Sequence, residues 1–283
     1  MYLTAERLAI ANQAIMETFE NTSIAWQAIP HWDTGDPGQT RVRDDIITTP
    51  PNPGFLNIEL EQVSFEVTLF QTSAPTPESL TTEIIMATTT LAKQFDDKVL
   101  AELRAKVPAT KDFSAGNAQG LLDNLIEARA TVEDAGYRAP SCLITNTLGL
   151  KYLSELSSGY PITEALLGAA NVNSLHRTSI LDEAVQAVDA AGALKVDGGG
   201  KAIMEPGAVL LMIGRRQRIA HGAAPDASPG EEPVDIAVSV PPSLEVVGEA
   251  PNSELALSVR VRFATRVKAM DALVERRVAT VVP

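Results

Sequence analysis

One long amphipathic helix constrains this chain more than any other feature of its sequence. Within residues 77–106 the apolar side chains recur every three or four positions and form one continuous stripe: Leu80, Ile84, Ala87, Leu91, Phe95, Val99 and Leu103. Thr76 and Pro77 are suited to begin a helix, and Pro108 ends the pattern. At 1.5 Å per residue such a helix is roughly 45 Å long, so a domain has to be organised around it.

The segment before this helix has the pattern of a β-strand. From Phe55 to Leu69 apolar side chains alternate with polar ones, many of them glutamates, with one break near Gln62. The pattern predicts a strand with one apolar and one acidic face, and a β-bulge at the break. Upstream, residues 28–54 are rich in proline and glycine, which predicts a long extended loop. A loop of this length usually serves a ligand or another subunit.

The rest of the chain alternates between helices and strands. Further helices are expected at residues 4–20, 119–135, 147–156 and 162–168. Further strands are expected at 141–146 and 208–213 and, with turns at Pro241-Pro242 and Pro251-Asn252, over about 236–263. Together these elements predict an α+β fold, and the chain length suggests two lobes.

Composition excludes several functional classes. The 283 residues include 36 acidic and 23 basic side chains, a net charge of −13, which argues against a surface that grips nucleic acid through phosphates. Cys142 is the single cysteine, and with the 3 histidines it gives no zinc-ligand spacing, so we expect neither a metal nor a cofactor. The amino terminus lacks the pattern of a signal peptide, and no apolar run approaches the ~20 residues of a membrane span. We therefore expect an intracellular protein that does not enter membranes.

Two motifs could carry chemistry, and each has a simpler interpretation. GGGKA at 198–202 lacks the hydroxyl residue that follows the lysine of a phosphate-binding loop, so it predicts a surface turn. HWDTGDPG at 31–38 brings together His31, Asp33 and Asp36 without the spacing of a calcium loop, so it predicts a polar loop. An enzyme that uses one of these segments is an alternative, but no nucleophile, base and orienting partner occur at a recognisable spacing. We expect that the chain is not an enzyme.

Arginines, aspartates and tryptophans outside these motifs are candidates for contacts between subunits. In an acidic chain, arginines pair more often with carboxylates of the same or a neighbouring subunit than with phosphates. Tryptophans that flank a proline in a polar segment mark either an interface or local packing. The candidates are Trp26, Trp32, Arg41, Arg43, Asp44, Asp45, Arg215, Arg216 and Arg218.

The order of these elements resembles that of the shell proteins with the Hong Kong 97 capsid fold, found in tailed-phage major capsid proteins and bacterial encapsulins. The resemblance runs from Trp26 to the last strand. It rests on the passage VSFEVTLFQTSAPTPESLTTEIIMATTTLAKQFDDKVL, the segment AGYRAPSCLITNTLGLKYLSEL followed by GYPITEALL, and the ending LALSVRVRFATRVKAMDALV. It implies an amino-terminal arm (1–33), an E-loop (34–70), a peripheral domain with a spine helix (71–114), an axial domain (115–239) and returning peripheral strands (240–283).

The resemblance also implies a function. It predicts a major capsid protein that assembles through pentamers and hexamers into an icosahedral head around double-stranded DNA, without sequence-specific binding. An encapsulin shell around a cargo enzyme is the alternative. The implied partners are copies of the chain and scaffolding, portal or decoration proteins, and the implied location is the virion, assembled in the host cytoplasm. The first lysine is Lys93, inside the predicted long helix, so a covalent crosslink from an E-loop lysine is not expected.

Overall fold

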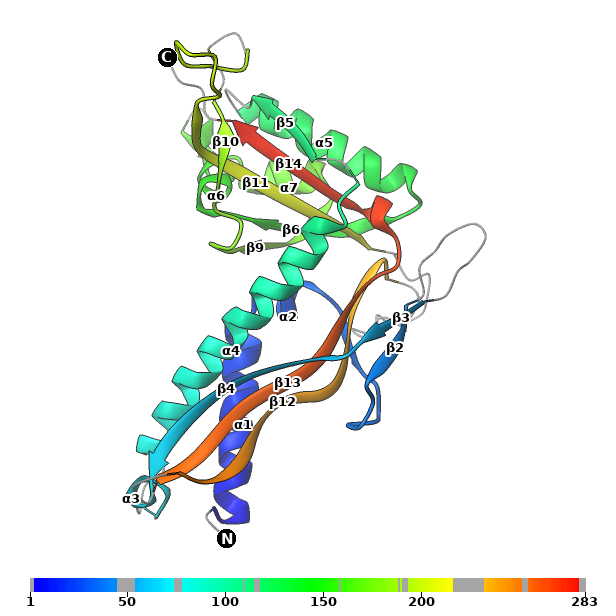
Figure 1. Cartoon of the computed structure of the whole chain (residues 1–283). Helices are drawn as coiled ribbons and strands as arrows, with labels where there is room; N and C mark the ends of the chain where they lie inside the picture. Colours follow the sequence, from blue (N-terminus) through cyan, green and yellow to red (C-terminus); the bar gives the residue numbers. More distant parts are fainter. Residues whose placement is uncertain are drawn as a thin grey trace. The chain divides into compact units, whose positions relative to one another are not determined.

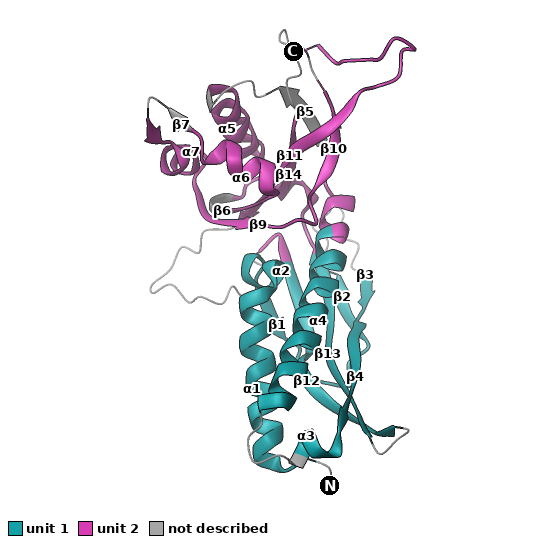
Figure 2. Ribbon diagram, turned by 90° about the vertical axis from the view of Figure 1, so that its left-hand side faces the viewer, with its two compact units in different colours: residues 1–100, 235–266 teal, residues 101–234, 267–283 magenta. Residues whose placement is uncertain are grey.

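The structure, a computed structural model, describes residues 3–44, 54–73, 78–108, 110–114, 118–157, 159–187, 189, 193–215, 232–250 and 254–279. The chain forms two compact units, coloured separately in Figure 2. Unit 1 comprises residues 1–100 and 235–266, and unit 2 comprises residues 101–234 and 267–283. None of the helices in the described ranges has the length and apolar content that crossing a membrane requires.

Unit 1 is built on a four-stranded sheet with two long helices along one side. The sheet has the order β1 (His31–Asp33), β12 (Val234–Ala250), β13 (Glu254–Val267) and β4 (Glu59–Thr68). Figure 1 shows α1 (Ala5–Thr22) and α4 (Glu78–Ala105) running along this sheet. The predicted helices at 4–20 and 77–106 are thereby confirmed, although Thr76 and Pro77 lie outside the described residues.

The apolar stripe of α4 forms the centre of the unit 1 core. Leu80, Ile84, Leu91, Phe95 and Val99 are each at most 2% exposed. The ring of Phe95 lies 5.2 Å from that of Phe19 in α1 and 4.5 Å from that of Phe263 in β13. Trp26, in the short helix α2 (Ile24–Ala28), adds a third aromatic contact to the same ring. One side of α4 therefore joins the amino-terminal helices to the sheet.

A buried carboxylate on α4 positions α2. Asp96 accepts a hydrogen bond from the Ser23 hydroxyl at 2.6 Å and one each from the Ile24 and Ala25 N–H groups at 2.9 Å. Burial raises the pKa of Asp96, and this effect outweighs the hydrogen bonds, which lower it. The first N–H groups of α2 thus obtain their partners from another helix.

Strand β4 differs from its prediction at one point. It pairs with β13 in an unbroken antiparallel register, from Glu59 opposite Phe263 to Thr68 opposite Glu254, so the predicted bulge near Gln62 is wrong. Alternation is kept because Glu61 occupies an inward position while Leu60 is 46% exposed. The Glu61 carboxylate pairs there with Lys98 of α4, and this ion pair replaces the apolar contact that the pattern implied.

Strand β12 corrects a second prediction. It continues through Pro241 and Pro242, where the sequence suggested a turn. Its partner β1 covers it only at residues 236–238, so beyond that point β12 is an edge strand on this side. A proline lacks an N–H group and is tolerated where no neighbouring strand needs that donor. Farther along, the Leu244 N–H donates to the Asn12 side chain of α1 at 2.8 Å.

Unit 2 contains a six-stranded sheet covered by helices (Figure 1). The sheet has the order β5 (Thr110–Ser114), β14 (Leu273–Ala279), β11 (Met204–Arg215), β6 (Arg138–Thr145) and β9 (Val172–Arg177), with β10 (Glu183–Gln186) paired to β11. The helices are α5 (Ala118–Asp134), α6 (Thr147–Leu153) and α7 (Thr163–Ala169). Leu125 and Val132 of α5 pack in one core with Leu210 of β11 and Val274 of β14.

Smaller elements complete the chain. They are the hairpin strands β2 (Arg41–Asp44) and β3 (Gly54–Asn57), helix α3 (Leu69–Ser73), the strand pair β7 (Leu156–Ser157) and β8 (Tyr160–Pro161), and a 3₁₀ turn at Met270–Ala272. The last strand, β14, belongs to unit 2, whereas β12 and most of β13 belong to unit 1. The predicted domain of residues 240–283 therefore contains strands of both units, and the domain assignment stays a prediction.

Replacing Phe95 by alanine tests the aromatic centre of unit 1. The substitution removes a fully buried ring with three aromatic neighbours, so we expect the free energy of unfolding to fall by about 3–5 kcal/mol. Urea unfolding followed by tryptophan fluorescence measures it, since Trp26 and Trp32 both lie in unit 1. Leu60→Ala is the control, because that side chain is 46% exposed; equal losses in the two variants would contradict the assignment.

Candidate assembly surfaces

A β-hairpin in unit 1 carries several of the predicted contact residues. Strands β2 and β3 pair antiparallel, with Arg41 opposite Asn57 and Arg43 opposite Phe55. Side chains at these paired positions lie on the outer face, and Phe55 is 71% exposed. Val42 and Leu56 form the alternate pair on the inner face, where Val42 is 3% exposed. One face of the hairpin therefore packs against the rest of the chain, and the other face is exposed to solvent or a partner.

The inner face of the hairpin packs on the sheet of unit 1. Val42 and Ile58 form a small buried cluster with Ala237 of β12 and Ala264 of β13, and Trp32 and Leu56 pack against it. Apolar burial at these positions holds the base of the hairpin in a fixed place. Residues 45–53, between the two strands, lie outside the described residues.

A buried ion pair lies under the hairpin. The Arg266 guanidinium donates to both carboxylate oxygens of Asp235, at 2.6 and 2.7 Å, and both side chains are 3% exposed. Arg266 also donates to the Arg43 carbonyl at 3.2 Å and lies 4.8 Å from the ring centre of Trp32. The Trp32 indole N–H donates to Asp235 at 3.2 Å. Because each charge is paired and hydrogen-bonded, the pair can be buried without a large penalty.

A second arginine of β13 holds the loop that leads into the hairpin. Arg262 donates to the Pro37 carbonyl at 2.8 Å and to the Gln39 carbonyl at 3.1 Å. These carbonyls belong to a turn and have no strand partner, so the guanidinium satisfies them. Arg262 and Arg266 together attach residues 37–43 to β13.

The predicted contact residues lie in different environments. Trp26 is 7% exposed, stacks on His31 at 3.8 Å and contacts Phe19, so local packing accounts for its position. Trp32 is half-buried beside Arg266, as described above. Arg41 and Arg43 are exposed on the outer face of the hairpin, and Arg41 donates to Asn57 at 3.2 Å.

Of the remaining candidates, the structure describes Asp44 and Arg215. Asp44 is 8% exposed and lies on the inner side of the hairpin, away from the outward faces of its arginine neighbours. Arg215 is half-buried at the end of β11 in unit 2. Asp45, Arg216 and Arg218 lie outside the described residues. Participation of all these residues in subunit contacts stays a prediction.

The two motifs considered for catalysis shape turns. Asp33 accepts a hydrogen bond from the Gly35 N–H and Asp36 one from the Gly38 N–H, both at 2.8 Å. Asp197 accepts from the Gly199 and Lys201 N–H groups at 2.9 Å, which closes the predicted surface turn. Within the described ranges, no three or more His, Cys, Asp or Glu side chains form a group that could hold a metal ion.

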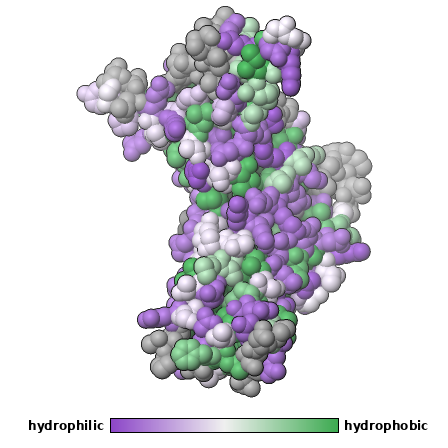
Figure 3. Space-filling view, turned by 60° about the vertical axis from the view of Figure 1, so that its left-hand side comes forward, coloured by the Kyte–Doolittle hydropathy of each residue, from purple (hydrophilic) through white to green (hydrophobic). Residues whose placement is uncertain are grey.

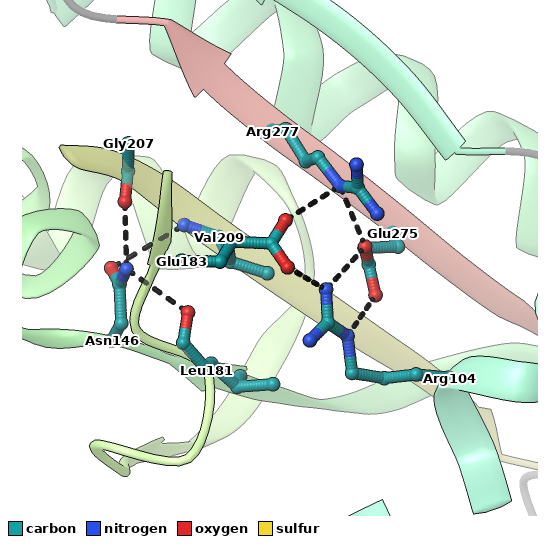
Figure 4. Close-up of polar contacts among 8 residues, drawn as sticks. All are labelled: Arg104, Asn146, Leu181, Glu183, Gly207, Val209, Glu275 and Arg277. Carbon is teal, nitrogen blue, oxygen red and sulfur yellow. Dashed lines mark hydrogen bonds and ion pairs between the residues drawn. The ribbon is translucent and has the colours of Figure 1, made fainter. Parts of the chain in front are cut away.

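An ionic network in unit 2 was not expected from the sequence (Figure 4). Arg104 donates to Glu275 at 2.7 and 3.0 Å and to Glu183 at 2.6 Å. Arg277 joins both carboxylates, at 2.8 Å to Glu183 and 3.0 Å to Glu275. Burial by itself would raise the pKa of Glu275, but the hydrogen bonds and charges of Arg104 and Arg277 outweigh it and lower that pKa. The network connects the last turn of α4 with β10 and β14.

A buried asparagine organises the neighbouring loop in the same view. The Asn146 amide donates to the Gly207 carbonyl at 2.7 Å and the Leu181 carbonyl at 3.3 Å, and its oxygen accepts from the Val209 N–H group (Figure 4). The same oxygen accepts from the Gly149 N–H group. It caps α6 at the end of β6. An asparagine directly before a predicted helix is a typical cap, and this signal was present in the sequence.

Comparison with known proteins identifies the fold of the chain. No protein-family model matches the chain, and no curated protein matches it. The match to the crystal structure of a virus-like particle from Pyrococcus furiosus covers 96% of this chain and 98% of the particle's chain, at 15% identity and a TM-score of 0.65. The match to the mature capsid of bacteriophage PhiM1 covers 94% of this chain and 87% of the capsid chain, at 11% identity and a TM-score of 0.51. The match to the holo-SrpI encapsulin complex from Synechococcus elongatus PCC 7942 covers 93% of this chain and 90% of the encapsulin chain, at 11% identity and a TM-score of 0.52.

The chain has the Hong Kong 97-like capsid fold. The predicted α+β class and the resemblance of the element order to this fold are confirmed. In the Hong Kong 97-like frame, the β2–β3 hairpin falls within residues 34–70, the segment that the resemblance identifies as the E-loop.

Exposed apolar side chains also occur outside the hairpin. Figure 3 shows a face that is mostly hydrophilic, with hydrophobic residues in small separate groups. Those of unit 1 with the greatest exposure are Phe70 at 78%, Phe55 at 71% and Val247 at 62%. Apolar side chains scattered in this way are normal on a protein surface and by themselves mark no site.

Arg266→Met tests the ion pair under the hairpin. The substitution leaves the carboxylate of Asp235 buried without its cation, so we expect a loss of about 3–5 kcal/mol in the free energy of unfolding. The hairpin base should also become accessible to trypsin at Arg41 and Arg43. Arg262→Met, which removes hydrogen bonds to one exposed and one partly buried carbonyl, is the matched control and should cost about 1 kcal/mol. A stability for Arg266→Met equal to that of the wild type would refute the role of the pair.

The lowered pKa of Glu275 predicts how stability depends on pH. Because this carboxyl releases its proton more readily in the folded chain, the stability it contributes is complete above its ordinary value of 4.5 and is lost as the pH falls through the lowered value. Thermal midpoints measured from pH 7 to pH 2 should fall more steeply for the wild type than for Glu275→Gln. Parallel curves for the two proteins would contradict this assignment.

Proposed function

We propose that the chain is the subunit of a closed protein shell. The observation that carries the proposal is the fold match over nearly the full length of both chains to a protein described as a virus-like particle. The projecting face of the hairpin supports it independently. Phe55 lies there directly opposite Arg43, and aromatic and arginine side chains are enriched at the centres of protein interfaces.

The arrangement suits repeated contacts between identical subunits. The base of the hairpin is held by Arg262, Arg266 and a small apolar cluster, so its outer face is presented in a fixed orientation. A fixed protruding face that contacts a different surface of the next subunit gives a heterologous contact, and such contacts close into rings or shells when the rotation permits. In this proposal the chain acts by its geometry and not as an enzyme, and Asp33 and Asp36 serve only their turns.

The finer proposal is a major capsid protein of a tailed phage. Its pentamers and hexamers would form an icosahedral head around double-stranded DNA, with scaffolding, portal or decoration proteins as partners. Assembly would occur in the host cytoplasm, and the finished protein would belong to the virion. The net charge of −13 supports enclosure without tight binding, because like charges repel the packaged DNA.

An encapsulin shell is the second candidate. The specific observation in its favour is the match to the holo-SrpI encapsulin complex over 93% of this chain. Such a shell would enclose a cargo protein instead of DNA. The two candidates share the assembly step and differ in the contents and diameter of the particle.

Size-exclusion chromatography with light scattering, followed by negative-stain microscopy, tests the proposal. The chain is measured alone and after co-expression with the products of the adjacent genes. We expect round particles of megadalton mass, and a species of 30.1 kDa under both conditions would contradict the proposal. Nuclease-protected DNA would favour the phage head, whereas a stoichiometric protein cargo in a small particle would favour the encapsulin.

Phe55→Ser tests the hairpin as an assembly surface. Because the ring is 71% exposed in the subunit, the substitution should change the free energy of unfolding by less than about 0.5 kcal/mol while it strongly reduces the yield of particles. Ile10→Ser is the control, an exposed apolar residue of α1. Normal assembly of Phe55→Ser, or an equal loss of assembly in both variants, would remove the hairpin from the proposal without removing the shell.

A further inference from the structure

The proposed assembly gives no role to a pocket in unit 2. Its volume is about 380 Å³, within the range of small-molecule sites. It lies where the carboxyl-terminal half of α5 meets the start of β14. The residues that line it are Pro108, Thr131, Ala135, Asp271, Leu273, Val274 and Arg276.

Arg276 is the unusual member of this lining. It stands on β14 between Val274 and Val278, which belong to the apolar core shared with α5, and it is 3% exposed. Its Nε and Nη2 atoms are buried and have no hydrogen-bond partner among the described residues. Other arginines with little exposure are paired: Arg266 with Asp235, and Arg104 with Glu275 and Glu183. Arg276 alone of these three combines deep burial with unsatisfied donors.

The charge of Arg276 cannot be removed by deprotonation. Burial lowers the pKa of this guanidinium, and the charge of Glu127 opposes that shift, but an arginine stays protonated at physiological pH. A buried, unpaired guanidinium costs several kcal/mol. Arg276 lines the pocket, but Nε and Nη2 have almost no accessible surface, so a ligand reaches them only when the side chain turns towards the pocket. An anion bound there would then supply the missing hydrogen bonds, which favours a ligand with negative charge.

The other side chains determine which anion fits. Pro108, Ala135, Leu273 and Val274 present apolar surface, which favours a hydrocarbon portion next to the charged group. The Thr131 hydroxyl already donates to the Glu127 carbonyl at 2.9 Å, which leaves Arg276 as the principal donor. The acidic side chains of Asp271, in the lining, and Glu127, one turn before Thr131, disfavour a second negative charge on the ligand.

We propose that this pocket binds a carboxylate with a single negative charge joined to a short apolar body, with Arg276 as the bidentate donor. A planar guanidinium matches the two oxygens of a carboxylate. Two sources share this chemistry: a free small acid, and the terminal carboxylate of another polypeptide. The site requires no assembly step, so it does not depend on the proposed shell function.

Titration with sodium hexanoate tests the site, with heteronuclear NMR or calorimetry as the readout. We expect saturable binding with a Kd on the order of 1 mM, and binding of the uncharged hexanamide at least about tenfold weaker. Arg276→Met should reduce hexanoate binding by at least about tenfold while the thermal midpoint stays unchanged or rises, because a buried charge is replaced by an apolar side chain of similar length. Arg177→Met, at an exposed arginine of β9, is the matched control and should bind like the wild type.

Further arms identify the source of the carboxylate. The peptide acetyl-Ala-Ala-Leu is tested with a free carboxyl terminus and as its amide. Binding of the free acid peptide tighter than hexanoate would assign the site to a polypeptide terminus, and binding of hexanoate alone would assign it to a small acid. Glu127→Gln should tighten hexanoate binding several-fold, because a like charge is removed.

Two results would overturn the proposal. One is the absence of saturable binding of both hexanoate and the peptide to the wild-type chain. The other is a marked fall in the thermal midpoint of Arg276→Met together with unchanged hexanoate affinity, which would show that Arg276 has an internal partner in solution and only a structural role.

Discussion

Burial of one side of α4 is the constraint on which unit 1 depends. A helix of 28 residues with a continuous apolar stripe is unstable unless another surface covers that stripe. Here the cover comes from α1, α2 and β13, through the rings of Phe19, Trp26 and Phe263 around Phe95. Asp96 and Lys98 extend the same helix into polar contacts with α2 and β4. The contacts of this one helix therefore position the amino-terminal helices and the sheet of unit 1.

Buried charges then specify where segments far apart in the sequence meet. The pair Arg266–Asp235 sits under the hairpin, and Arg104 with Glu275 joins α4 to the last strand. Such pairs add little net stability compared with apolar contacts, but breaking one of them is costly, so each penalises alternative arrangements. Arg276 shows the converse situation, since two of its buried donors have no hydrogen-bond partner among the described residues, and the proposed anion site rests on this observation.

The division of surfaces links the fold to the proposed shell. The hairpin directs Val42 inward and Phe55 outward because successive side chains of a strand alternate in direction. The inner side is buried within the chain, whereas the outer side exposes the ring of Phe55, which the proposed shell would cover. The same alternation on β14 sends Arg276 towards α5 and Glu275 towards the ionic network, so one strand serves two sites.

The amino-acid sequence by itself determined the long helix, its buried side, the order of elements and the resemblance to the Hong Kong 97-like fold, because these follow from periodicity and local propensity. It did not determine strand pairing. Glu61 interrupts the apolar alternation yet faces inward, because Lys98 of α4 forms an ion pair with it. Strand β12 continues through Pro241 and Pro242 because β1 does not pair with it there. The positions of Arg266 and Arg276 were likewise decided by tertiary structure. The Arg266 guanidinium pairs with a carboxylate 31 residues away, whereas two donors of Arg276 have no hydrogen-bond partner among the described residues, and only the packed sheet establishes that difference.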